Sequence, residues 1–335
     1  MKKWFPWVLT AIFAAWILSA FAPAKNKNNF RIKEFGELPV LLNGRIQPFD
    51  SVGKNALLSM SGKSTARAED KKSLSASEWL LEALTKPDEA NKRKIFRIQH
   101  PDLEGLLGTQ NAKLEYYSFN DLTNQLEQIE RQAQSLIKSE LDENGRPRED
   151  LVKLRTPFQK DLMHLYDSVI LFHRIKNSLQ PEGAKDFPLE LEIYQETIPL
   201  GRAALEQSEA GKEFDKQDLQ VIAGFFRRYQ TMSKFGYPLA VPPNAGQPRD
   251  AWKNVGSSLM ESMRDNEIHP AVNYFAKITS AYAKNQPADF NKAVSEYRGW
   301  LQSNNLLREL KKGREEFFFN HLEPFYKAMV IYVAA

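Results

Sequence analysis

The side chains best suited to ligand or proton chemistry in this chain are histidines, because cysteine is absent. The five are His100, His164, His173, His269 and His321. His164 and His173 fall on one predicted helix, but nine steps of about 100° place them on opposite sides of it, so they cannot share one metal ion. His100 and His269 each precede a proline, which favours a capping role at a helix start. This leaves His321, beside a phenylalanine cluster, as the weak candidate for a cofactor ligand.

The absence of cysteine removes several chemistries together. Disulfides, thiol catalysis, cysteine-based zinc sites and covalent haem attachment through C-x-x-C-H all need that side chain. No H-E-x-x-H, G-x-S-x-G or glycine-rich dinucleotide motif occurs either. Residues 62–65 (GKST) match the tail of a phosphate-binding loop, but Leu57 stands where that loop needs its first glycine. We therefore expect a protein that is not an enzyme and holds no metal or cofactor of its own.

Charge and composition restrict the partners. The 335 residues include 46 basic and 42 acidic side chains, for a net charge of +4. This mixed surface does not indicate nucleic-acid binding. The hydrophobic content of 42% is enough for a folded core.

Residues 38–58 (LPVLLNGRIQPFDSVGKNALL) combine three structural signals in a short stretch. An apolar, extended lead-in is followed by a turn at Asn43-Gly44, and a helical pattern follows Asp50-Ser51, either of which could cap it. Arg45 and Asp50 within this central motif could pair and pin the lead-in to the helix. A role in binding a partner is equally compatible with the sequence.

The central motif resembles the extracytoplasmic segment of bacterial fused cytochrome c biogenesis proteins of the CcsA-type, system II, haem-handling family. The matching segments are residues 38–40 (LPV), 43–46 (NGRI), 48–50 (PFD), 55–58 (NALL), 96–103 (FRIQHPDL) and 319–329 (FNHLEPFYKAM). The chain departs from the family where an arginine usually follows the aspartate turn, since it has Gly53-Lys54 there. The family's tryptophan-rich haem motif has no counterpart among the six scattered tryptophans.

The resemblance implies a biological role. It implies a non-catalytic scaffold or partner-binding component for haem delivery and attachment, with haem handled by a polytopic cytochrome c synthetase subunit rather than by this chain. The partner-binding candidates that fall in the matching segments are Arg45, Pro48, Asp50, Asn55, Arg97, His100, Pro101 and Asp102. The alternative is a membrane-anchored helical interaction protein of the envelope that is unrelated to haem.

The first 24 residues predict the compartment. Lys2-Lys3 precede 21 uncharged residues, 4–24, enough for a helix that crosses a bilayer of roughly 30 Å. The two lysines predict a cytoplasmic N-terminus at the bacterial inner membrane, with the bulk of the chain in the periplasm. Small residues at 20–24 also resemble a cleavage site, so the segment is either an anchor or a signal peptide.

Hydrophobic periodicity predicts a mainly α fold with an irregular helical extracytoplasmic domain. We expect the central motif within 25–60, a linker over 61–78, the helical domain over 79–321 and an apolar end over 322–335. That end is either the start of a truncated transmembrane segment or a helix at the membrane surface.

Within the helical domain, Ser77 is expected to cap a helix that ends before Pro87, and residues 94–100 to form a short strand. One long helix from a capping box at Ser118 to Leu141 and a second from Thr156-Pro157 are expected to form an antiparallel hairpin. Further helices are expected over 189–209, 215–234, 249–264, 270–285, 287–303 and 305–321. Residues 236–243, rich in proline, should form an extended loop that crosses the surface rather than covering a groove.

Overall fold

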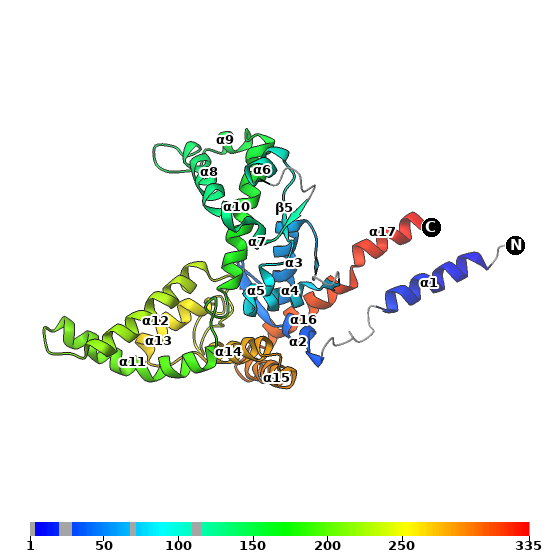
Figure 1. Cartoon of the computed structure of the whole chain (residues 1–335). Helices are drawn as coiled ribbons and strands as arrows, with labels where there is room; N and C mark the ends of the chain where they lie inside the picture. Colours follow the sequence, from blue (N-terminus) through cyan, green and yellow to red (C-terminus); the bar gives the residue numbers. More distant parts are fainter. Residues whose placement is uncertain (1–3, 20–28, 68–71, 109–114, 335) are drawn as a thin grey trace.

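The central motif folds into a hairpin and a helix that lie at the middle of the molecule (Figure 1). A computed structural model describes residues 4–19, 29–67, 72–108 and 115–334. Strands β1 (Pro39–Leu42) and β2 (Arg45–Pro48) pair antiparallel around the turn at Asn43-Gly44, both of which have positive φ. Helix α3 (Phe49–Ser61) follows at once and buries its apolar face. The predicted strand, turn and helix order is confirmed.

The described part of the chain is mainly helical, as predicted. Its remaining strands are two short antiparallel pairs, β3 (Ala66–Arg67) with β4 (Ser73–Leu74) and β5 (Phe96–Arg97) with β6 (Tyr116–Tyr117). The helices of the first half are α1 (Phe5–Ser19), α2 (Ile32–Gly36), α4 (Ala76–Thr85), α5 (Pro87–Ala90), α6 (Pro101–Leu106), α7 (Phe119–Leu122), α8 (Leu126–Ser139), α9 (Glu149–Lys153) and α10 (Pro157–Lys176). The helices of the second half are α11 (Phe187–Glu209), α12 (Lys216–Phe235), α13 (Val255–Asp265), α14 (Pro270–Ala283), α15 (Pro287–Ser303), α16 (Leu307–Leu322) and α17 (Pro324–Ala334).

Helix α3 packs closely on α4 because Gly53 has no side chain. A Cβ at Gly53 would lie 2.7 Å from the Ala76 carbonyl oxygen. Phe49, in the first turn of α3, stacks on Phe35 at 4.8 Å and meets Phe275 edge-on at 5.9 Å, which joins α2, α3 and α14 in one core. A larger side chain at position 53 would therefore collide with α4.

Ser77 does not cap α4, contrary to the prediction. The cap is Ser75, whose Oγ accepts from the Glu78 amide while the Glu78 carboxylate accepts from the Ser75 amide. This capping box fits the S-x-x-E spacing two residues earlier. Ser77 lies inside the helix, where it is buried.

The predicted helical hairpin is correct in its second helix and partly wrong in its first. Thr156 and Gln159 form the predicted capping box of α10. The first helix is not continuous, because a 3₁₀ turn at Thr123–Gln125 separates α7 from α8. Helices α8 and α10 nevertheless pack against each other.

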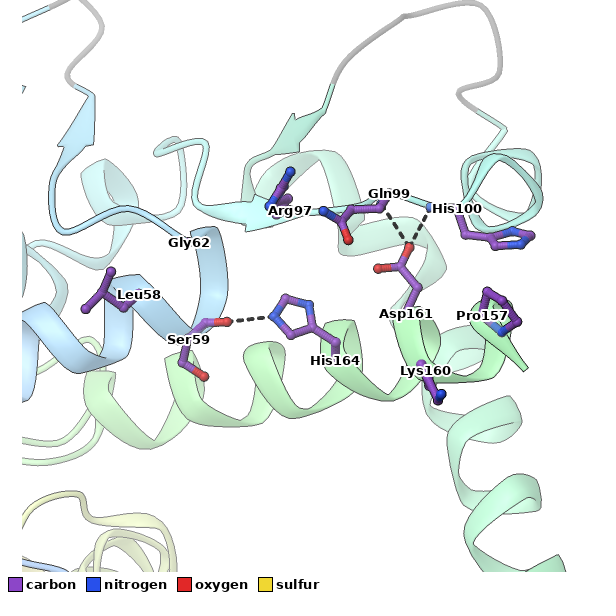
Figure 2. Close-up of a pocket in the computed structure, with 10 residues that line it drawn as sticks. All are labelled: Leu58, Ser59, Gly62, Arg97, Gln99, His100, Pro157, Lys160, Asp161 and His164. Carbon is purple, nitrogen blue, oxygen red and sulfur yellow. Dashed lines mark hydrogen bonds between the residues drawn. The ribbon is translucent and has the colours of Figure 1, made fainter. Parts of the chain in front are cut away.

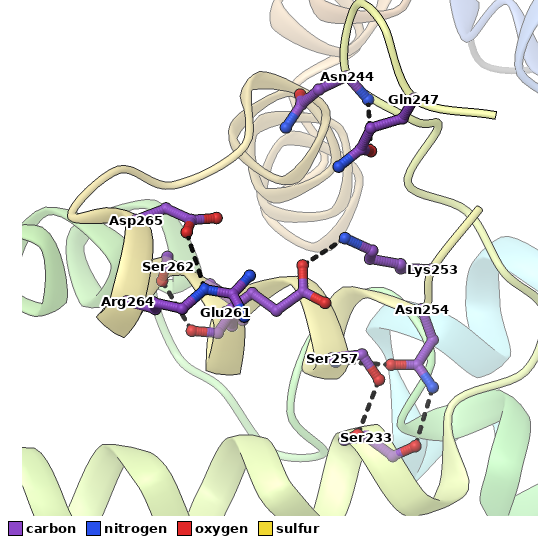
Figure 3. A network of polar contacts seen from close by, with 11 residues as sticks. Ser233, Asn244, Gln247, Lys253, Asn254, Ser257, Glu261, Ser262, Arg264 and Asp265 are labelled. Atoms are coloured by element: carbon purple, nitrogen blue, oxygen red, sulfur yellow. Dashed lines mark hydrogen bonds and ion pairs between the residues drawn. The ribbon is translucent and has the colours of Figure 1, made fainter. Parts of the chain in front are cut away.

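The later helices match the predicted ranges within about three residues at most ends, except at the start of α13. Asn254 caps α13 by accepting from the Ser257 amide at 2.7 Å, while Lys253 pairs with Val241 in an extended bridge, so residues 249–253 are not helical. The Asn254 side-chain amide also donates to the Ser233 carbonyl at 2.9 Å, which fixes α13 to α12 (Figure 3).

The proline-rich loop is extended, as predicted, but it does not simply cross the surface. Leu239 pairs with Leu41 of β1, and Ala240 and Val241 are buried. The loop thereby extends the central hairpin and closes one side of the core.

Helices α1 and α17 project from the body on the same side (Figure 1). Tyr326 of α17 meets Trp16 of α1 edge-on at 6.4 Å. The last five residues of the predicted 4–24 segment lie outside the described residues. In the part of the chain that is described, no helix combines the length and apolar character needed to span a membrane.

Candidate functional site

Most of the predicted site residues lie near the two ends of α3. We call the N-terminal turn of α3, with Asp50 and Ser51, the closed end, because α16 covers it. We call the C-terminal turn, with Leu58, Ser59 and Gly62, the open end, because it borders a cavity.

At the closed end, Arg45 pairs with Glu316 of α16 rather than with Asp50. The Arg45 guanidinium donates to both Glu316 carboxylate oxygens, at 2.6 and 3.2 Å. The Ser51 hydroxyl donates to the same carboxylate at 2.6 Å and accepts from the Asn320 side chain at 2.9 Å. The predicted Arg45–Asp50 pair is therefore wrong, because a residue 271 positions away holds the arginine.

Asp50 is almost fully buried and is held by α4. Its carboxylate accepts from the Ser77 hydroxyl at 2.6 Å. His321 lies near its other oxygen, at 3.9 Å, which is too long for a hydrogen bond. This arrangement explains why Ser77 faces the core instead of capping α4.

His321, the weak cofactor candidate, is tied to its own helix. Its Nδ1 lies 2.9 Å from the Phe317 carbonyl oxygen, which can only accept, so Nδ1 carries the proton. Its ring stacks on Phe317 with 4.0 Å between centroids. Among the described residues, no three His, Asp or Glu side chains gather where they could hold a metal ion.

The other two motif candidates differ in exposure. Pro48 is buried and stands at the N-cap of α3, whereas Asn55 is exposed on its outer face. Lys54 beside it lines a cavity of about 490 Å³ at the α16–α17 junction, with Asn320, Pro324 and Phe325 among the other lining residues.

At the open end, a cavity of about 560 Å³ lies between the end of α3, the β5–α6 connection and the first turns of α10 (Figure 2). Its lining residues are Leu58, Ser59, Gly62, Arg97, Gln99, His100, Pro157, Lys160, Asp161 and His164. Of the predicted candidates, Arg97 and His100 lie here. Pro101 and Asp102 form the start of α6 beside the cavity.

His100 has the predicted capping role. Its Nδ1 accepts from the Asp102 amide at 3.2 Å, and Pro101 occupies the first position of α6. His269 caps α14 in the same way, by accepting from the Ala271 amide at 3.1 Å. Burial lowers the pKa of His269 to about 4, with a smaller contribution from Lys253, so this cap stays neutral.

Asp161 and His164 line the same cavity as Arg97 and His100, but the sequence analysis did not group them with these two residues. One Asp161 oxygen accepts from the amides of Gln99 and His100, at 2.9 and 2.8 Å. His164 Nε2 lies 2.6 Å from the Ser59 carbonyl oxygen (Figure 2). Their spacing of three places them on one face of α10, which is the signal that could have grouped them.

The two histidines of α10 are separated, as predicted. His173 meets the Phe119 ring edge-on at 5.1 Å, and burial lowers its pKa below the usual range, aided by Lys176.

Asp167 lies one turn after His164 on the same helix. Burial raises the pKa of its carboxyl group above the usual range.

A scan against protein-family models finds no match to this chain, and a search of curated proteins finds no matching relative.

Proposed function

We propose that this chain is a non-catalytic scaffold that meets a membrane through α1 and α17 and binds a protein partner with its helical body. The observation that carries the proposal is the pair of exposed apolar helices on one side of the body (Figure 1). Exposed apolar surface of this extent is typical of contact with lipid or another protein.

The surface of this helix pair is nearly free of charge. Helix α1 has no charged residue, and Trp7 is 77% exposed. The single charge of α17, Lys327, is only 8% exposed and lies over the Trp16 ring, 5.5 Å from its centroid. Phe325, by contrast, is 80% exposed. The lysine is thus turned inward and the aromatic side chains outward, the reverse of a water-facing helix.

The resemblance of the central motif supplies the biological setting of the proposal. In that setting the chain is an inner-membrane protein with its N-terminus in the cytoplasm and its body in the periplasm, where it assists cytochrome c biogenesis. A polytopic haem-handling partner carries the haem. The chain's own contribution is contact, because its polar motif residues are engaged in holding α16 and α4 to α3.

One observation favours the rival function, an envelope interaction protein unrelated to haem. Leu189, Ile193 and Leu200 are each about half exposed on α11. Steps of four and seven place all three on one face of the helix. This face lies on the arm formed by α11, α12 and α13, away from the α1–α17 pair (Figure 1).

Purification of the full chain from cross-linked bacterial envelopes separates the two functions. We expect it in the inner-membrane fraction, together with a polytopic protein that carries a tryptophan-rich haem motif. As a control, Ile193→Gln makes the exposed apolar face of α11 more polar, and it should leave that partner bound. Loss of the partner on this substitution, or recovery of the chain only in the cytosol, would contradict the proposal.

Titration of the purified chain with haem tests the proposal that a partner carries the haem and this chain does not. We expect no shift of the haem Soret band at micromolar haem when the chain is alone. A saturable shift that is lost in His321→Ala would assign haem binding to this chain instead.

A further inference from the structure

The cavity at the open end of α3 contains cationic groups that the proposed scaffold does not use. Lys160 has no side-chain hydrogen-bond or ion-pair partner within the described ranges. Arg97 donates through Nε and Nη2 to Glu115, at 3.0 and 2.7 Å. When the Gln99 amide is turned so that its oxygen faces Arg97, it also accepts from this guanidinium. Arg97 is thereby held in place, while the Lys160 ammonium is available.

One oxygen of the Asp161 carboxylate, the acidic group of the cavity, is engaged by backbone donors. Asp161 accepts from two amides, those of Gln99 and His100. These charge-assisted bonds stabilise the carboxylate where it stands. Asp161 therefore positions the β5–α6 connection and does not form an ion pair with Lys160.

The two histidines of the cavity present one donor and one acceptor. Nε2 of His164 donates to the Ser59 carbonyl, so its Nδ1 is left as an acceptor. Nδ1 of His100 accepts from the Asp102 amide, so its Nε2 is left as a donor. Because the Arg97 charge is paired with Glu115, Lys160 is the cation without an ion-pair partner among the described lining residues.

We propose that this cavity binds a small organic molecule that bears an oxyanion, a phosphate or a carboxylate group. Lys160 would contact the oxyanion, while Arg97 and His100 line other parts of the same cavity (Figure 2). The cavity volume of about 560 Å³ is far larger than a bare anion needs and lies within the range of about 300–1,000 Å³ of small-molecule sites. Leu58 and Pro157 provide apolar surface for the rest of the molecule. This binding goes beyond the scaffold function and does not depend on the membrane or on haem.

Calorimetric titration of the full chain in detergent tests the proposal, with inorganic phosphate and acetate as separate probes and sodium chloride holding the ionic strength constant. We expect saturable binding of at least one probe, which identifies the preferred oxyanion. Lys160→Ala should weaken that binding about tenfold or more, because a charge-assisted bond is lost. Lys216→Ala is the matched control, since Lys216 lies in the first turn of α12, is exposed and lies outside the cavity.

A second pair of variants leaves the cationic groups untouched. Leu58 is 43% exposed, so a polar side chain is tolerated there. Leu58→Glu should weaken oxyanion binding by charge repulsion, while Leu58→Gln, of equal size, should retain it within about threefold. The proposal is overturned if neither probe binds saturably, if the Lys160 and Lys216 variants bind alike, or if Glu and Gln at position 58 have the same effect.

Discussion

The two ends of α3 use similar residue types for different purposes. At the closed end, Arg45, Ser51 and Glu316 satisfy one another across the α3–α16 contact. At the open end, one Asp161 oxygen accepts from two backbone amides, and the Lys160 side chain is left without a partner among the described residues. Polar residues of the central motif can therefore be structural, while nearby residues outside the motif border the cavity where we propose that a ligand binds.

The largest expected effect is at the α3–α4 contact beside the closed end. Gly53→Ala should lower the free energy of unfolding by about 2 kcal/mol or more, because the new Cβ would lie 2.7 Å from a backbone carbonyl that cannot move aside. Denaturant unfolding of the full chain in detergent measures the change.

The matched control for Gly53→Ala is Gly299→Ala in α15. A Cβ there meets nothing within 4 Å, so alanine should stabilise that helix by up to about 1 kcal/mol. Equal effects of the two substitutions would show that α4 does not restrict the start of α3.

The second largest expected effect tests whether the polar network at the closed end stabilises the fold. Glu316→Gln should lower the free energy of unfolding by about 1 kcal/mol, because it removes a carboxylate that accepts from both Arg45 and Ser51. Glu315→Gln, at the exposed neighbouring position, should be neutral. If both variants unfold alike, the closed end is not held by this network.

The smallest effect is expected at the open end. Lys160→Ala and Leu58→Gln should each change the free energy of unfolding by no more than about 0.5 kcal/mol, because both side chains lack a polar partner and are not in the core. A loss of about 2 kcal/mol or more in either variant, measured by denaturant unfolding, would mean that the open end is as structural as the closed end.

Sequence reasoning succeeded where the signal is local. The capping box at Thr156 and Gln159 and the histidine caps at His100 and His269 depend on residues within three positions. Most helix ranges followed from apolar periodicity and from prolines in first turns. The wrong cap at Ser77 shows the limit of this approach, because Ser75 with Glu78 was the better local match.

The contacts that shape the two ends could not be predicted, because they join distant segments. Glu316 lies 271 positions from Arg45, and Asp161 lies 61 positions from His100. A single sequence shows which residues can form ion pairs and hydrogen bonds, but not which partner the fold brings to them. The predicted Arg45–Asp50 pair failed for this reason, as nearness in sequence was the only available guide.

The most direct test of the difference between the ends is the denaturant midpoint of the full chain, measured with and without the oxyanion that binds. A ligand that binds only the folded state raises this midpoint. We predict a lower midpoint but an undiminished ligand-induced rise for Glu316→Gln, and an unchanged midpoint with little or no rise for Lys160→Ala. A lost rise in Glu316→Gln, or a full rise in Lys160→Ala, would contradict the account.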